Sequence, residues 1–249
     1  MEKVCALCRV NTDLQKSHII PELFYTMVYD LKPRRFRVIS ADPSVPERFE
    51  QKGIRERLLC KACEGRLARW EKYVKKTFVD GRGVTSMPIQ DGFRLQGIKY
   101  KTFKLFLMSL LWRMSVSSLE FFNLVDLEAE VEEQLRVALL KEDPLAPDEF
   151  PCVFVIVKVG GKLMRDWIHQ PSLFTGSHGE RICCLVINGI MYVFTIGKQP
   201  ASSVASQAAI NEKNEMIMLD SNAWDYPFLR EDLISQFGAI LERKKAKGG

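Results

Sequence analysis

Four cysteines in two Cys-x-x-Cys pairs are the residues whose types and spacing point most directly to chemistry. The first pair is Cys5 and Cys8, and the second is Cys60 and Cys63. A two-residue spacer lets a tight turn direct both sulfurs of a pair at one ion, and two such pairs supply the four thiolates of a tetrahedral zinc site. The sequence therefore predicts a structural zinc ion bound by these four side chains.

A histidine lies between the two cysteine pairs, in the stretch Ser17-His18-Ile19-Ile20-Pro21. An imidazole suits the role of a general base, because its unperturbed pKa of about 6.5 leaves much of it neutral at working pH. The zinc site is expected to hold the end of this strand rigid. His18 is therefore the candidate for acid–base chemistry.

In these segments the chain resembles the zinc-containing HNH nucleases, members of the ββα-metal group with a treble-clef-like core. The resemblance covers about the first 80 residues and nothing after them. The matching segments, in chain order, are Cys5-Ala6-Leu7-Cys8, Ser17-His18-Ile19-Ile20-Pro21 and Leu58-Leu59-Cys60-Lys61-Ala62-Cys63.

The resemblance implies a metal-dependent nuclease that hydrolyses phosphodiester bonds. In such an enzyme His18 would take a proton from water, while a separate Mg²⁺ or Mn²⁺ ion would polarise the scissile phosphate. The zinc ion would only hold the strand and the helix in their mutual geometry, because four thiolates leave it no open position.

The chain departs from the family pattern at three positions. Ser17 stands where an aspartate or another metal-binding residue is usual, and Glu64 stands where histidine or asparagine is usual. Arg55 replaces the expected asparagine. We expect Glu64, with Ser17 as a weaker contact, to hold the catalytic ion, and Arg55 to act in catalysis by clamping a phosphate.

The net charge of +5 is unevenly distributed. Residues 1–85 contain 18 Lys and Arg against 11 Asp and Glu, so the metal-binding end is the basic end. Clustered lysines and arginines are typical of proteins that neutralise phosphates. Nucleic acid is therefore the expected partner, with DNA favoured over RNA. The candidate nucleic-acid-binding residues are Arg34, Arg35, Arg37, Lys52, Arg57, Arg66, Arg69, Lys75 and Lys76.

The predicted fold class is α+β, with a treble-clef-like, zinc-bound ββα unit followed by helices packed on a small antiparallel sheet. We divide the chain into a zinc-binding domain, 1–85, and a helical and β-hairpin domain of unassigned role, 86–249. Apolar periodicity predicts helices and Asn-Gly or Gly-Gly turns predict hairpins. Residues 33–53 are expected to form a surface insertion and 80–97 a turn-rich link. The expected helices are 64–78, 102–116, 127–140 and 228–243, and the expected hairpins are 153–168 and 182–196.

Two other readings of the amino-terminal region remain open. It could be a catalytically inactive zinc module that only binds nucleic acid, or a protein-interaction module with a structural zinc. The carboxy-terminal region could mediate homo-oligomer formation or bind a regulatory partner. We expect a cytoplasmic protein, because the seven cysteines do not resemble a disulfide framework. We also expect no signal peptide, since the first residues lead directly to Cys5, and no membrane span, since no apolar run is long enough.

Overall fold

A computed structural model of the chain describes residues 4–10, 12–38, 48–163, 165, 167–200, 202–231 and 234. The helices are α1 (Glu22–Tyr25), α2 (Lys61–Val74), which continues as a π-helical turn (Lys75–Val79), α3 (Tyr100–Val116), α4 (Ala129–Lys141) and α5 (Val204–Ala208), with short 3₁₀ turns at Glu120–Phe122 and Ala223–Asp225. The strands are β1 (Leu14–His18), β2 (Asp30–Leu31), β3 (Arg34–Val38), β4 (Arg48–Glu50), β5 (Arg55–Cys60), β6 (Thr85–Ile89), β7 (Gly92–Gln96), β8 (Cys152–Val159), β9 (Lys162–Leu163), β10 (Ser172–Thr175), β11 (Arg181–Ile187), β12 (Ile190–Thr195) and β13 (Glu215–Asn222).

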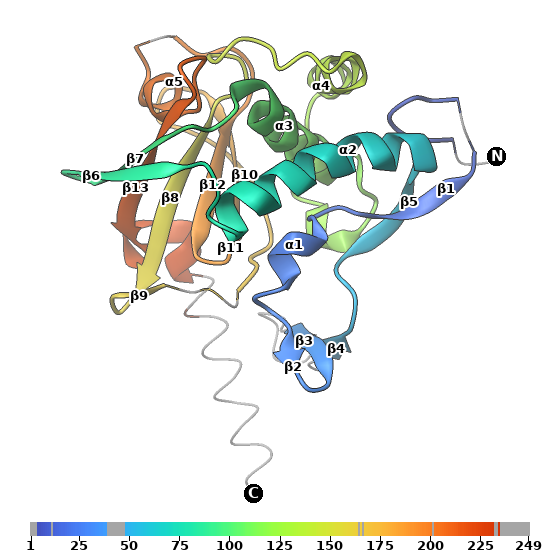
Figure 1. The fold of residues 1–249 in the computed structure, drawn as a ribbon, viewed down its shortest axis with the longest axis horizontal. Coiled ribbons are helices and arrows are strands. Elements are labelled where there is room, and N and C mark those ends of the chain that lie inside the picture. Colours follow the sequence, from blue (N-terminus) through green and yellow to red (C-terminus); the bar gives the residue numbers. More distant parts are fainter. Residues whose placement is uncertain are drawn as a thin grey trace, which may run out of the picture.

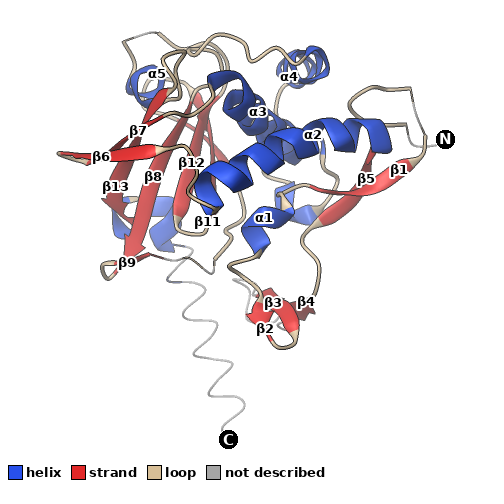
Figure 2. Cartoon of the chain, in the orientation of Figure 1, coloured by secondary structure: helices blue, strands red, loops and turns tan. Residues whose placement is uncertain are grey.

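Helix α2 connects the two ends of the molecule (Figure 1). It begins at the pair of strands β1 and β5 and runs towards the large sheet, with α3 packed along it. The short sheet formed by β2, β3 and β4 is separate from the β1–β5 pair and from the large sheet (Figure 2). The α+β prediction is confirmed.

A ββα unit forms around the second cysteine pair. Strands β1 and β5 pair antiparallel, with Leu14 opposite Cys60 and His18 opposite Arg55. Helix α2 starts at Lys61, directly after the last residue of β5. Its buried residues Leu67, Trp70 and Val74 recur at helical spacing, and this pattern predicted the helix.

The prediction of a small antiparallel sheet is wrong. The described residues form an eight-stranded mixed sheet in the order β10-β11-β12-β8-β13-β7-β6, with β9 paired to β8. Strand β13 joins the two halves of this sheet, because it pairs parallel to β8 and antiparallel to β7. Long-range pairing of this kind leaves no signal at the turns, where hairpins are recognised.

The segment 80–97, expected to be a link, instead contains the hairpin β6–β7. Gly92 within this segment has a structural role in the sheet. A Cβ atom on Gly92 would lie 2.1 Å from the carbonyl oxygen of Met218, and its φ angle is 150°. Glycine is therefore required where β13 approaches β7.

The hairpin at Asn188-Gly189 is confirmed. Strands β11 and β12 flank this dipeptide, and Ile187 pairs with Ile190. Both turn residues have positive φ angles, 53° at Asn188 and 77° at Gly189, as the tight hairpin turn demands. The hairpin at 153–168 is shorter than expected, because β9 comprises two residues.

The surface insertion expected at 33–53 has regular structure at both of its ends. Strand β3 pairs with β2 on one side and with β4 on the other, and residues 39–47 lie outside the described part. At its carboxy-terminal end the insertion packs against Tyr25, because a Cβ atom on Gly53 would lie 2.4 Å from the Tyr25 ring. The Tyr25 hydroxyl also accepts a hydrogen bond from the Ile54 amide at 3.0 Å.

One buried apolar cluster contains residues from both sides of the predicted boundary at residue 85. Trp70 from α2, Phe103 and Phe106 from α3 and Phe154 from β8 all belong to it. The rings of Phe103 and Phe154 stack with their centroids 5.7 Å apart. The division into two domains stays a prediction, and most of the helix expected at 228–243 lies outside the described residues.

Candidate metal centre and histidine site

The four cysteines of the two pairs lie together at the start of α2. Their sulfur atoms lie within 4.8 Å of one another, and all four thiols are free of disulfides. Cys5 and Cys8 come from a turn in which the Arg9 amide donates to the Cys5 carbonyl oxygen at 2.8 Å. Arg9 closes this turn with a φ angle of 58°.

The second pair is positioned by the junction of β5 and α2. Cys60 ends the strand and caps the helix, and Cys63 lies in the first helical turn. The Ala6 amide donates to the Leu58 carbonyl oxygen at 3.0 Å, which ties the first turn to β5. Residues 52 or more positions apart are thereby brought to one point.

This sulfur geometry fits a zinc ion. The Sγ atoms of Cys8 and Cys60 are 3.9 Å apart, close to the roughly 3.8 Å that a tetrahedral site with Zn–S bonds of about 2.3 Å requires. Burial raises the pKa of the Cys5 and Cys63 thiols above the ordinary value. A bound cation reverses this tendency and holds the thiolate forms, so the donor set suits a soft divalent metal.

Arg136 of α4 supports the first cysteine turn, a role that the sequence did not reveal. It donates to the Leu7 carbonyl oxygen at 2.6 Å and to both carboxylate oxygens of Glu133, at 2.8 and 2.7 Å. Arg9 donates to the same carboxylate at 2.6 Å. Hydrogen bonds from Arg136 lower the pKa of Glu133 to about 2, so the carboxylate remains charged at neutral pH.

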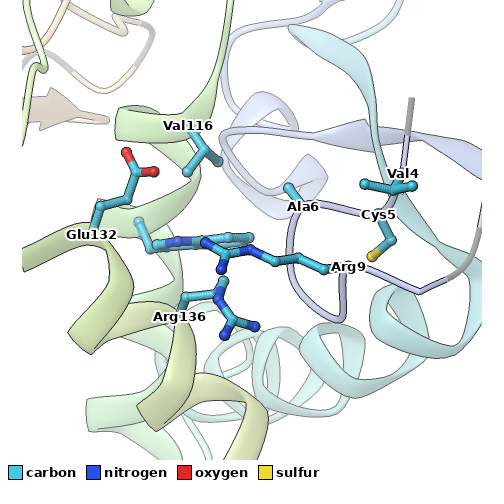
Figure 3. Close-up of a pocket in the computed structure, with 8 residues that line it drawn as sticks. Val4, Cys5, Ala6, Arg9, Val116, Glu132 and Arg136 are labelled. Atoms are coloured by element: carbon cyan, nitrogen blue, oxygen red, sulfur yellow. The ribbon is translucent and has the colours of Figure 1, made fainter. Parts of the chain in front are cut away.

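A cavity of about 310 Å³ lies beside this turn. Figure 3 shows Arg9 crossing towards Arg136, with Glu132 and Val116 at the far wall. None of the residues that we predict to be catalytic lines this cavity. It therefore belongs to the surroundings of the metal centre rather than to the histidine site.

His18 ends β1 with its side chain 27% exposed, close to a carboxylate that the sequence analysis missed. Its Nε2 atom lies 2.8 Å from Glu22 Oε2, although the contact is not aligned as a hydrogen bond. Burial lowers the pKa of His18, Glu22 opposes this shift, and Arg55 reinforces it. The sequence did not reveal this neighbour, because His18 ends a strand and Glu22 begins a short helix, so their four-residue spacing follows no single helical or strand period.

The second residue that the sequence analysis did not assign is Arg113 of α3. Its Nη1 donates to the His18 carbonyl oxygen and to Glu71 Oε1, both at 2.8 Å, and its Nε donates to the Ser109 carbonyl oxygen at 3.1 Å. The side chain is 3% exposed. The sequence signal for this role is an arginine within an apolar helix, because a buried guanidinium requires hydrogen-bond acceptors.

A second tie joins α3 to the ββα unit at β5. The Glu56 carboxylate accepts hydrogen bonds from the Ser117 hydroxyl at 2.9 Å, the Ser118 amide at 3.0 Å and the Ser118 hydroxyl at 2.5 Å. Glu56 is the neighbour of Arg55, which pairs with His18 across the strands. The end of α3 therefore fixes both strands of the histidine site.

Glu64 is half-buried in the first turn of α2. Burial raises its pKa, while the Ser17 hydroxyl and Arg113 act in the opposite direction and Glu71 adds to the rise. Ser17 is fully buried, and its hydroxyl accepts the Leu59 amide at 3.1 Å. Glu64 therefore interacts with Arg113 and Glu71, two groups that also act on His18, and the Ser17 hydroxyl joins it to the β1–β5 pair.

The arrangement can hold a hard cation only through a partial ligand set. Within the described residues, the four cysteines are the one group of three or more candidate ligands close enough to share an ion. Mg²⁺ commonly keeps several waters and takes one or two carboxylates together with substrate phosphates. Glu64 fits such a site as a single carboxylate ligand.

The predicted nucleic-acid-binding residues divide into two groups. Arg66 donates to the Leu140 carbonyl oxygen and Arg69 binds Glu142 at 2.5 Å, so both attach α2 to the end of α4. The side chains of Lys52, Arg57, Lys75 and Lys76 are exposed, Arg34 and Arg35 stand on the β2–β4 sheet, and the backbone of Arg37 lies on β3. The Arg57 guanidinium also donates to the Leu14 carbonyl oxygen at 2.9 Å.

Comparisons with protein-family models, with curated proteins and with solved structures found no match to this chain. Among the described residues, no helix is both long enough and apolar enough to span a membrane. The candidate chemistry lies at two places, the four-cysteine centre and the histidine site at the other end of the β1–β5 pair.

Proposed function

We propose that this chain is a metal-dependent nuclease in which His18 is the general base. The observation that supports the proposal is the convergence of His18 with two carboxylates and two arginines, at the other end of the β1–β5 pair from Cys60. The pKa of His18 responds to the charges of Glu22, Glu71, Arg55 and Arg113. Perturbed titratable groups of opposite charge gathered around one imidazole are typical of catalytic sites.

Each group has a role in phosphodiester hydrolysis. His18 takes a proton from the attacking water, and Glu22, 2.8 Å from Nε2, stabilises the imidazolium that forms. Arg55, opposite His18 in the strand register, binds a phosphate oxygen of the substrate. Glu64 would hold a divalent cation, which would supply charge stabilisation at the scissile phosphate.

The test is cleavage of plasmid DNA with added Mg²⁺ or Mn²⁺, for the wild-type chain and for His18→Ala. We expect His18→Ala to lose at least about a hundredfold in rate, the usual share of a general base. His178→Ala is the matched control, because His178 lies in a loop with its side chain 89% exposed. Zinc content and the circular dichroism spectrum should be the same in all three proteins.

Retained cutting by His18→Ala with intact zinc content would overturn the proposal. A second candidate, a zinc module that binds nucleic acid without catalysis, is favoured by one observation. The described residues contain no second group of three metal ligands around His18. Salt-dependent binding of DNA together with the absence of cleavage for every added metal would establish this second candidate instead.

A further inference from the structure

A basic surface lies at the end of α2 that is remote from the four cysteines. Residues 72–85 and 97–99 contain five Lys and Arg against one Asp. All five cationic residues are exposed, and none of them forms an ion pair with another described residue. We call these five the basic patch, and they are Lys72, Lys75, Lys76, Arg82 and Lys99.

Three of the five cations lie on one face of α2 and of its π-helical continuation. Lys72 precedes Lys75 and Lys76 by three and four residues, so the three side chains leave the helix on the same side. The buried residues Trp70 and Val74 occupy the opposite side. The three ammonium groups therefore face solvent together.

Two hydrogen bonds bring the other two cations to this end of α2. The Arg82 amide donates to the Lys76 carbonyl oxygen at 3.1 Å. The Lys99 amide donates to the Tyr73 hydroxyl at 2.7 Å. Both bonds use main-chain amides, so the guanidinium and the ammonium of these two residues remain open to solvent.

The segments that carry Arg82 and Lys99 also approach each other. A Cβ atom on Gly97 would lie 2.5 Å from the carbonyl oxygen of Gly83, and the φ angle of Gly97 is 86°. Glycine is therefore required where these segments meet. The basic patch is thus one region of the surface, built from both sides of the predicted boundary at residue 85.

The aromatic rings next to the basic patch are engaged in packing. Phe78 is half-buried, and its ring centroid lies 4.9 Å from that of Phe103. Tyr73 is also half-buried, with its hydroxyl bonded to the Lys99 amide. Proteins that bind unpaired bases commonly stack them on open rings. The basic patch offers charge instead, which suits backbone phosphates.

The basic patch adjoins the histidine site along α2. Glu71, which accepts a hydrogen bond from Arg113 at 2.8 Å, precedes Lys75 by one helical turn. Arg113 in turn donates to the His18 carbonyl oxygen at 2.8 Å. A phosphate held at Lys75 would therefore lie about one turn of helix from the ion pair that positions His18.

We propose that the basic patch binds the phosphate backbone of double-stranded nucleic acid without regard to base sequence. The inference rests on the proposed function for its choice of nucleic acid, and it adds the substrate class and a second contact surface. A duplex carries one charge per about 1.7 Å of its axis, about twice the density of a single strand. A surface that acts through charge alone therefore favours the duplex.

The test measures binding separately from cutting. Fluorescence anisotropy of the zinc-loaded full chain, without added Mg²⁺ or Mn²⁺, is recorded over a range of salt concentrations with a labelled DNA duplex of about 20 base pairs and with one of its strands. Lys76→Gln and Lys99→Gln each remove one charge and leave the main-chain contacts of the patch in place. Each should lower the salt slope of duplex binding by about one, and the double variant by about two.

Lys162→Gln is the matched control. Lys162 is also exposed and forms no ion pair within the part of the chain that the structure describes. It lies on β9, at the lower edge of the large sheet and away from α3 in Figure 1. Its loss should leave the salt slope unchanged. Circular dichroism and zinc content check the fold of each variant.

Wild-type salt slopes in both lysine variants, or an equal loss in Lys162→Gln, would overturn the inference. So would tighter binding of the single strand than of the duplex, undetectable binding of both DNAs at low salt, or binding of phosphatidylserine vesicles without binding of the duplex. A chain that cleaves DNA through His18 while both variants bind normally would keep the proposed function and lose this inference alone. A chain that binds the duplex through Lys76 and Lys99 but never cleaves would do the reverse.

Discussion

The guanidinium of Arg113 donates a hydrogen bond to the carbonyl oxygen of His18 at 2.8 Å. The two residues are 95 positions apart, and Arg113 lies within the apolar helix α3. The same Nη1 atom also contacts Glu71 at 2.8 Å. Arg113 is therefore a positioning residue, because it sets the backbone of His18 without reaching the reacting atoms in the proposed mechanism.

Replacing Arg113 should disturb the histidine site without removing its charge. Arg113→Lys keeps the charge, but a single ammonium cannot reproduce the planar fork that contacts Ser109, His18 and Glu71. We expect the free energy of unfolding to fall by about 1–3 kcal/mol, as for a broken buried hydrogen-bond network. Urea unfolding monitored by circular dichroism measures the loss.

A double-mutant cycle with Glu71→Gln identifies the cause. If the ion pair couples the two residues, the combined change should differ from the sum of the single changes by at least about 0.5 kcal/mol. Cleavage by Arg113→Lys should show a lower kcat with little change in KM, because the His18 backbone moves while the substrate contacts remain. Wild-type stability and wild-type kcat would contradict the positioning role.

The fragment 1–85 should not fold by itself, even with zinc. Helix α2 buries Leu67, Trp70 and Val74 in the apolar cluster that α3 completes. Exposure of these three side chains forfeits roughly 1.5–3 kcal/mol each, which is comparable with the whole stability of a domain. The measurement is the proton–nitrogen correlation spectrum of the zinc-loaded fragment beside that of the full chain.

We expect poor dispersion of the fragment's amide signals and a non-cooperative thermal transition. The observation against this prediction would be a dispersed spectrum together with cooperative unfolding. That result would support the division of the chain at residue 85 into two independent domains.

The four-cysteine centre should bind one zinc ion per chain. Cys60→Ser should lose most of the zinc and destabilise the junction of β5 and α2, because removal of a thiolate from a four-sulfur site weakens both binding and folding. Cys184→Ala is the control, since Cys184 is 3% exposed in the large sheet and remote in sequence from the metal pairs. Elemental analysis of the purified proteins gives the stoichiometry.

Wild-type protein without zinc after expression in zinc-supplemented medium would contradict the metal centre. Full zinc content in Cys60→Ser would contradict the assignment of that ligand. Loss of zinc from Cys184→Ala would show that the metal depends on the general fold rather than on the four sulfurs.

Lys104 should make the stability of the chain depend on alkaline pH. Lys104 is 1% exposed, and its ammonium donates to the carbonyl oxygens of Glu149 at 2.5 Å and Phe150 at 3.0 Å. Burial lowers the pKa of Lys104 to about 8 from the ordinary 10.5. Between these pH values the unfolded chain binds the proton and the folded chain does not, so the unfolding free energy rises with pH.

The comparison with Lys104→Met isolates this effect, because the other titrating groups are common to both proteins. From about pH 7.5 to about pH 10, wild type should gain about 2 kcal/mol relative to the variant, less than the full value of the shift. Urea unfolding at the two pH values provides the measurement. A difference between the proteins that does not change with pH would contradict a lowered pKa of Lys104.

Local patterns in the sequence predicted the local elements well. The apolar period of residues 64–78 predicted α2, and Asn188-Gly189 predicted the hairpin between β11 and β12. These signals arise from turns and helical faces that a few neighbouring residues define. The hairpin β6–β7 forms where the sequence predicts a link, because glycines indicate turns without showing which strand the flanking residues pair with.

The sequence by itself determined the candidate metal centre of four cysteines, because the chemistry of the thiols and the geometry of two Cys-x-x-Cys turns are encoded in neighbouring positions. It also identified His18 as the candidate base. Only the tertiary structure decided which groups surround that imidazole. Glu22 contacts the ring, Arg113 donates to the His18 carbonyl oxygen, and Glu71 contacts Arg113, each from a different helix. A buried arginine does not reveal its acceptors until distant segments of the chain have packed together.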